Sequence, residues 1–229
     1  MPSESVIVFH DLIGDGVHAL GGSIFLVPSR TGLRPLTIEC RMRPDPLAWW
    51  HSQFSEVAPR GHLLRQALSR HWVRFHSLPE AKRYAKSDAE YVELLTRHVS
   101  VASSIFNAGE QLYVYRAWID EPRLRGKKRH QLAGRQFRDA VARLPVDAAH
   151  DEDRMHVRAL VSTWKPDFFE TTVRLLADWE EVGVSFVSPT TRNILCPYDG
   201  GMDVFAFSVT PDELRARYPS WLSRLPSGL

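Results

Sequence analysis

The chain has 229 residues, of which 44% are hydrophobic and 24% charged, a balance that excludes a disordered or collagen-like protein. Lys and Arg number 29 against 27 Asp and Glu, so the formal charge of +2 gives no argument for a nucleic-acid partner. The two cysteines, Cys40 and Cys196, lie far apart without a second ligand nearby, which excludes a disulfide scaffold and a zinc motif. We therefore expect a cytoplasmic protein with no cofactor, no metal, no signal peptide and no membrane segment.

The first third of the chain predicts strands followed by two helices. Short runs rich in β-branched and aromatic residues, bounded by Gly, Pro or Asp, predict strands at 5–9, 23–27 and 36–42. Asp45 and Pro46 predict the start of a helix, because Asp caps a helix and Pro fits its first position. That helix carries Trp49, Trp50 and Phe54 inward. A second helix is expected after Pro59, over 62–69, followed by a strand over 72–76.

The middle of the chain predicts a long helix between two strands. Ser87 and Glu90 have the spacing of a capping box, so a helix is expected from there to about Phe106. Strands are expected over 112–119 and 155–164. The apolar positions 132, 137, 141 and 144 indicate a short helix before Pro145.

The last third predicts helix, strand, hairpin and helix. Pro166 opens a helix whose buried side includes Trp179, with Gly183 as its left-handed C-cap. A strand over 184–187 follows. The Asp199-Gly200 dipeptide indicates a hairpin leading into 203–207. Thr210 and Glu213 predict a capped C-terminal helix.

This order of elements predicts an α+β fold, with a mixed or mostly antiparallel sheet and helices packed on it. We expect a single domain over 1–229, and the charged stretch near 145–154 is the place where it would subdivide. The sequence contains no internal repeat.

The sharpest charge feature is the run 123–130, which holds six titratable cations in eight residues. Like charges at this density must face water or an anion. A solvated loop is one interpretation. The other is contact with nucleic acid or with an acidic protein, through Arg123, Arg125, Lys127, Lys128 and Arg129.

Motifs for catalysis are missing from the sequence. There is no Gly-x-Ser-x-Gly elbow for a nucleophile, and no phosphate-binding or dinucleotide fingerprint. Two groups of His and Asp, at 10–18 and 150–156, lack a recognised ligand spacing, so exposed charge is the preferred interpretation of both. We expect a protein that is not an enzyme.

Two stretches resemble a signature of bacterial proteins that share a domain of unknown function. The first is RFHSLPEAKRY at 74–84, with the helix that follows it. The second is PYDGGMDV at 197–204, followed by the ending RYPSWLSRLPSGL at 217–229. The resemblance covers about a third of the chain and leaves residues 1 to about 68 outside it. It implies a bacterial protein and carries over no catalytic role.

The two signatures contain the candidate binding residues. The first supplies an anion-binding group of Arg74, His76, Lys82, Arg83 and Tyr84. The second supplies two carboxylates, Asp199 and Asp203. If the signatures meet, Asp203 would pair with an arginine of the first, at position 74 or 83. A structural ion pair is the preferred interpretation of that contact, because such pairs commonly mimic functional sites.

We therefore expect a non-enzymatic protein-binding module, of the kind represented by immunity-type proteins that neutralise a cognate toxin. Two alternatives stay open. One is a nucleic-acid-associated protein that uses the basic run 123–130. The other is a small hydrolase that uses His76 with Asp199 or Asp203.

Overall fold

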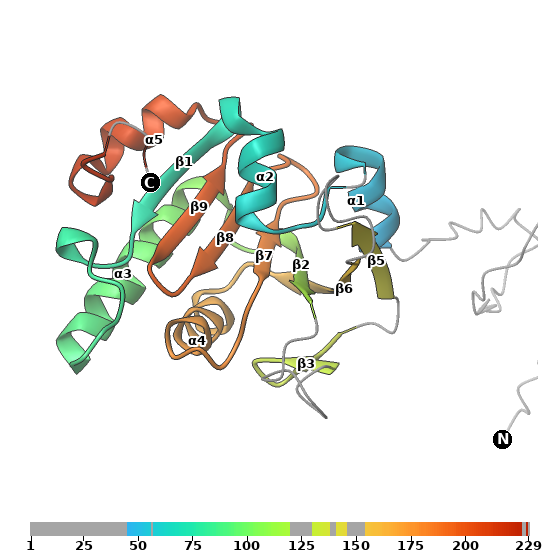
Figure 1. The fold of residues 1–229 in the computed structure, drawn as a ribbon, viewed down its shortest axis with the longest axis horizontal. Helices are drawn as coiled ribbons and strands as arrows, with labels where there is room; N and C mark the ends of the chain where they lie inside the picture. The colour runs from blue at the N-terminus through green and yellow to red at the C-terminus, as the bar shows by residue number, and fades with distance from the viewer. Residues whose placement is uncertain are drawn as a thin grey trace, which may run out of the picture. The chain divides into compact units, whose positions relative to one another are not determined.

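The computed structural model describes residues 45–55, 57–119, 130–137, 141–145, 154–225 and 228. Residues 45–229 form a compact unit separate from residues 1–44, and the fold described below is that of this unit (Figure 1). The strands expected over 5–9, 23–27 and 36–42 lie outside the described residues. So do Arg123, Arg125, Lys127, Lys128 and Arg129.

Seven strands form one antiparallel sheet in the order β1-β9-β8-β7-β2-β6-β5. Their bounds are β1 Trp72–His76, β2 Gln111–Trp118, β5 Val141–Pro145, β6 Arg154–Thr163, β7 Val184–Val187, β8 Ile194–Tyr198 and β9 Gly201–Phe205. Pro145 lies opposite Arg154 in the β5–β6 pair, so the strands on both sides of the charged stretch near 145–154 belong to the same sheet. The α+β class is confirmed, and every strand pair of this sheet is antiparallel.

The helices cover both faces of the sheet, as Figure 1 shows. They are α1 Pro46–Phe54, α2 Gly61–Ala67, α3 Asp88–Ile105, α4 Pro166–Ala177 and α5 Pro211–Arg217, with short 3-10 turns η1 Ser69–His71, η2 Pro79–Ala81 and η5 Pro219–Trp221. No helix of the described residues is long and apolar enough to cross a lipid bilayer.

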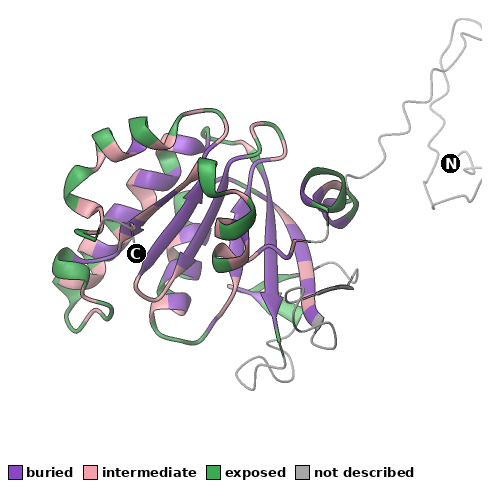
Figure 2. Ribbon diagram, turned by 45° about the horizontal axis from the view of Figure 1, so that its top comes forward, coloured by how far each residue is buried: buried purple, intermediate pink, exposed green. Residues whose placement is uncertain are grey.

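Each face of the sheet has its own hydrophobic core, because successive strand residues point to opposite sides. On one face α3, α4 and α5 pack on strand residues that include Phe75, Val114 and Phe186. On the other face α1 and α2 pack on Tyr113, Tyr115 and Phe205, among others. Strands β2, β7, β8 and β9 are therefore buried on both sides along most of their length (Figure 2).

The helix starts follow the predicted caps, with one correction. The Asp45 carboxylate accepts from the Leu47 amide at 2.9 Å, and α5 begins with the complete capping box of Thr210 and Glu213. At α3 the Ser87 hydroxyl accepts from the Glu90 amide. The Glu90 carboxylate, however, accepts from the Lys86 amide at 2.6 Å and pairs with Lys82, so the reciprocal half of the predicted box is wrong.

The helix expected before Pro145 is also wrong. Residues 131–136 form a small hairpin, with β3 Gln131–Leu132 paired to β4 Arg135–Gln136, and β5 follows. Ala133 and Gly134 have φ values of 45° and 76°. Two left-handed residues in a two-residue loop give the turn type that suits a hairpin, and this local turn prevails over the helix-like spacing of the apolar residues.

The end of α4 differs from the prediction as well. The helix stops at Ala177, and Trp179 is 44% exposed although it was expected on the buried side. Gly183 is left-handed, with φ 62°, but it lies beyond the helix end and precedes β7. A Cβ on Gly183 would sit 2.0 Å from the Ala117 carbonyl oxygen. The glycine is therefore required by the close approach of this segment to β2, and not by a helix cap.

Candidate partner-binding site

The two signature segments meet at the edge of the sheet. Strand β1 pairs with β9, so that Arg74 lies opposite Asp203 and His76 opposite Gly201. The Asp199-Gly200 dipeptide forms the predicted two-residue loop between β8 and β9. The Gly200 carbonyl of this loop accepts from the Ser77 amide at 3.1 Å.

Asp203 is the buried centre of a group that we call the hairpin cluster: Trp72, Arg74, Tyr198 and Asp203. The Asp203 carboxylate accepts from Arg74 Nε at 2.8 Å and from Arg74 Nη2 at 2.9 Å. It also accepts from Trp72 Nε1 at 2.8 Å. Asp203 is only 2% exposed, so this bidentate pair satisfies a charge that would otherwise be costly to bury.

The surroundings fix the Arg74 side chain in place. Its guanidinium lies 5.6 Å from the Trp72 ring and 5.1 Å from the Tyr198 ring. Helix α2 begins directly over the pair, since a Cβ on Gly61 would sit 2.6 Å from Asp203 Oδ2. The hairpin cluster therefore has the character of a structural ion pair that joins β1, β9 and α2.

The residues that a hydrolase would use are not brought together. Both carboxylates are held by arginines, Asp203 by Arg74 and Asp199 by Arg83, the latter at 2.7 Å. Within the described residues no hydrogen bond joins the His76 ring to either carboxylate. Burial and the charges of Arg74 and Arg97 lower the pKa of His76. Neither carboxylate is therefore placed to orient this histidine as a general base.

Cys196 is equally unsuited to nucleophilic chemistry. It is buried on β8, and its Sγ lies 3.1 Å from Ser185 Oγ. Burial raises the pKa of the thiol well above its usual value, whereas a reactive cysteine needs a lowered pKa. Among the described residues no group of His, Cys, Asp and Glu is arranged to hold a metal ion.

Beside the hairpin cluster lies a group of exposed side chains, which we call the exposed patch: Arg83, Tyr84 and Trp179. Their exposure is large, at 41% for Tyr84, 44% for Trp179 and 58% for the Arg83 side chain. The Arg83 guanidinium lies 5.5 Å from the Tyr84 ring and 5.6 Å from the Trp179 ring. The two ring centroids are 6.2 Å apart.

Trp179 occupies an unusual backbone position. Its φ of 61° is left-handed, and its amide donates to the Leu176 carbonyl while the Glu180 amide donates to the Leu175 carbonyl. These two bonds define a Schellman motif, in which the left-handed position is normally glycine. The segment that presents Arg83 and Tyr84 is also strained, because Glu80 and Ala81 both have φ 54°.

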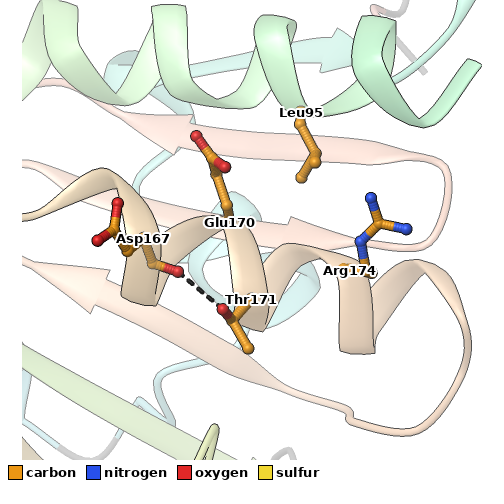
Figure 3. A pocket seen from close by; sticks show the side chains of 5 residues that line it. All are labelled: Leu95, Asp167, Glu170, Thr171 and Arg174. Atoms are coloured by element: carbon orange, nitrogen blue, oxygen red, sulfur yellow. Dashed lines mark hydrogen bonds between the residues drawn. The ribbon is translucent and has the colours of Figure 1, made fainter. Parts of the chain in front are cut away.

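The exposed patch continues into a pocket between α3 and α4. Tyr91 donates a hydrogen bond to Asp178, and the Arg174 guanidinium lies 4.6 Å from the Tyr91 ring. Arg174 also lines the pocket, which has a volume of about 340 Å³ and is bounded further by Leu95, Asp167, Glu170 and Thr171. Figure 3 shows Leu95 extending from α3 towards α4, and Glu170 and Arg174 extending from α4 towards α3.

A family model described as "Domain of unknown function (DUF3885)" matches residues 60–226. The chain belongs to the DUF3885 family. No curated protein and no solved structure matches the chain. The family match begins at α2 and includes every residue of the hairpin cluster and of the exposed patch, so both groups lie within the DUF3885 domain.

The structure divides the predicted site residues of this DUF3885 chain into separate groups. Arg74 and Asp203 lie in the hairpin cluster, and Arg83 and Tyr84 lie in the exposed patch. Asp199 follows Tyr198 of the hairpin cluster in the chain and forms an ion pair with Arg83 of the exposed patch. Lys82 pairs with Glu90 next to the exposed patch.

Trp179 is the member of the exposed patch that sequence reasoning missed. Helical spacing counted from Phe168 and Val173 placed it on the buried side of α4. The acidic residues that follow Ala177 were the available signal for an earlier helix end, because negative charge is disfavoured at a helix C-terminus. In the structure Asp178 is the C-cap residue, and Trp179 follows it in the left-handed position.

Proposed function

We propose that this DUF3885 protein is a non-enzymatic protein-binding module whose contact surface is the exposed patch. The observation that carries the proposal is Trp179, a large ring held outside the core at a backbone position that favours glycine. Trp, Tyr and Arg are the residue types most enriched among the energetically dominant residues of protein interfaces. The exposed patch brings one of each together.

The cost of this arrangement supports a functional role. A non-glycine residue in the left-handed region is strained by about 1 to 2 kcal/mol. Trp179 is 44% exposed, and its ring packs with Tyr84 and Arg83, which are themselves exposed. Strain of this kind is concentrated at binding and active sites.

The local charges favour a protein over a nucleic acid at the exposed patch. The Arg83 guanidinium already pairs with the Asp199 carboxylate, which largely cancels its attraction for phosphate. The neighbouring Lys82 is paired with Glu90 in the same way. Protein interfaces tolerate such mixed charges around an aromatic centre, whereas binding to nucleic acid depends on unneutralised cations.

The more specific role that we propose for the module is that of an immunity-type protein, with a cognate toxin as its partner. The absence of catalytic motifs from the sequence and the mixed charges around the aromatic rings of the exposed patch support this role. In the competing nucleic-acid role, the contacts would come from the basic run 123–130, of which residues 123–129 lie outside the described residues.

The test is purification of the tagged full chain from its native host at near-physiological salt, with and without nuclease. We expect one stoichiometric protein to co-elute, to survive nuclease and to be lost with Trp179→Gly. Leu225→Ala, which truncates another exposed apolar residue (60% exposed), is the matched control and retains the partner. A partner that Trp179→Gly retains, or recovery of nucleic acid alone, would contradict the proposal.

A further inference from the structure

A second surface of the domain is strongly basic. Between Val57 and Pro79 the sequence contains four arginines and three histidines and no aspartate or glutamate. The seven basic residues are Arg60, His62, Arg65, Arg70, His71, Arg74 and His76, and none of them is buried. We call this segment, which runs through α2, η1 and β1, the basic strip.

The folded chain keeps the charges of the basic strip close together. The guanidinium groups of Arg65 and Arg74 each lie 5.6 Å from the centre of the Trp72 ring. Burial and the charges of Arg60 and Arg65 lower the pKa of His62, as burial and two other arginines do for His76. Arg74 is already paired with Asp203, and a lowered pKa favours the neutral form of His62 and His76, so the positive charge of the basic strip rests on Arg60, Arg65 and Arg70.

Two helices on the opposite face of the sheet, α3 and α4, carry the opposite charge. Helix α3 contains Asp88, Glu90 and Glu93 but only one Lys or Arg, and α4 contains Asp167 and Glu170 with a single arginine. The net charge of the whole chain is close to zero, but positive charge is concentrated on α2 and β1 and negative charge on α3 and α4. Local fields of this kind select partners by their charge.

The structure assigns the basic strip as a docking surface for an acidic segment of a protein partner, a contact distinct from the exposed patch. The chain itself shows how this surface binds a carboxylate, since Arg74 and the Trp72 indole hold Asp203 through three hydrogen bonds. Carboxylates and planar guanidinium groups match in geometry.

The same surface is less suited to single-stranded nucleic acid. Such strands bind by stacking bases on accessible aromatic rings. The Trp72 ring, however, is contacted by Arg65 and Arg74, and a Cβ on Gly228 would lie 3.4 Å from it. Charge pairing with carboxylates needs no free ring, so the observations favour the acidic segment.

The experiment measures binding of a fluorescent decaglutamate peptide to the full chain by anisotropy at about 50 mM salt, where exposed charges are weakly screened. We expect Arg65→Gln with Arg70→Gln to weaken binding about fivefold or more, as removal of two interfacial charges should. Lys165→Gln with Arg217→Gln removes the same charge from exposed positions outside the basic strip and should leave affinity within about twofold.

Three results would overturn the assignment: no peptide binding, equal losses in the two double variants, or tighter binding of a decathymidine strand than of the peptide. Thermal melting of each variant checks that it is folded. Because the double variants leave the exposed patch intact, failure here is distinguishable from failure of the proposed protein-binding function, which Trp179→Gly tests.

Discussion

Replacement of Trp179 separates the contribution of its ring from that of its backbone. Trp179→Ala removes the contacts with Tyr84 and Arg83, worth about 0.5–1.5 kcal/mol for the aromatic pair and about 0.5–1 kcal/mol for the cation–π contact. The left-handed φ of 61° remains. The free energy of unfolding should therefore fall by about 1–2.5 kcal/mol.

Trp179→Gly loses the same contacts but relieves the left-handed strain of about 1–2 kcal/mol. The greater freedom of glycine in the unfolded chain offsets about 0.4–1 kcal/mol of that gain. The Gly variant should thus be about 0.5–1 kcal/mol more stable than the Ala variant, although glycine buries less surface. Both variants should lose the partner equally.

Urea unfolding of the three proteins measures this difference. With a slope near 2 kcal/mol per molar urea, the midpoint of the Gly variant should exceed that of the Ala variant by about 0.25–0.5 M. Equal midpoints, or a lower midpoint for the Gly variant, would show that the left-handed position of Trp179 is not strained.

Three further predictions concern the core. Asp203→Asn leaves the charge of Arg74 without its partner and should lower the free energy of unfolding, measured in urea, by about 3 kcal/mol. Asp212→Asn, at an exposed ion pair, should change it by less than about 0.5 kcal/mol. Burial lowers the pKa of His98 to about 4, so the unfolded chain gains a proton first as pH falls. About 3 kcal/mol of the free energy of unfolding, present above pH 6.5, should be lost as the pH falls towards 4. In His98→Gln the free energy of unfolding should depend less on pH over this range. In a Cys40→Ser chain, Cys196 should react with a thiol reagent only after unfolding; rapid labelling of the native protein would contradict its burial.

Local signals allowed much of the fold to be predicted. The caps at Asp45 and Thr210 and the loop at Asp199 fix the backbone through contacts between residues that are close in sequence. The predictions failed where two local patterns competed. The turn at Ala133 and Gly134 is a tight left-handed reversal, which the helix-like spacing of the flanking apolar residues concealed.

The candidate site was less accessible from sequence, because its members come from distant segments. The alternation of β1 placed Arg74 and His76 on one face, and the pairing of Arg74 with Asp203 was one of the two predicted contacts. The choice between the two arginines depends on the register of β1 against β9, which no local pattern sets. Trp179 reaches the exposed patch only because α4 ends before it.

Binding at the exposed patch is tested in native host cells by irradiating a chain that carries a photo-crosslinking amino acid at position 84. We expect one dominant crosslinked protein, which disappears when Trp179→Gly is added. The same amino acid at position 53, exposed on α1, should give none. Crosslinks of equal yield from both positions, or a product unaffected by Trp179→Gly, would contradict the claim that the exposed patch binds a protein partner.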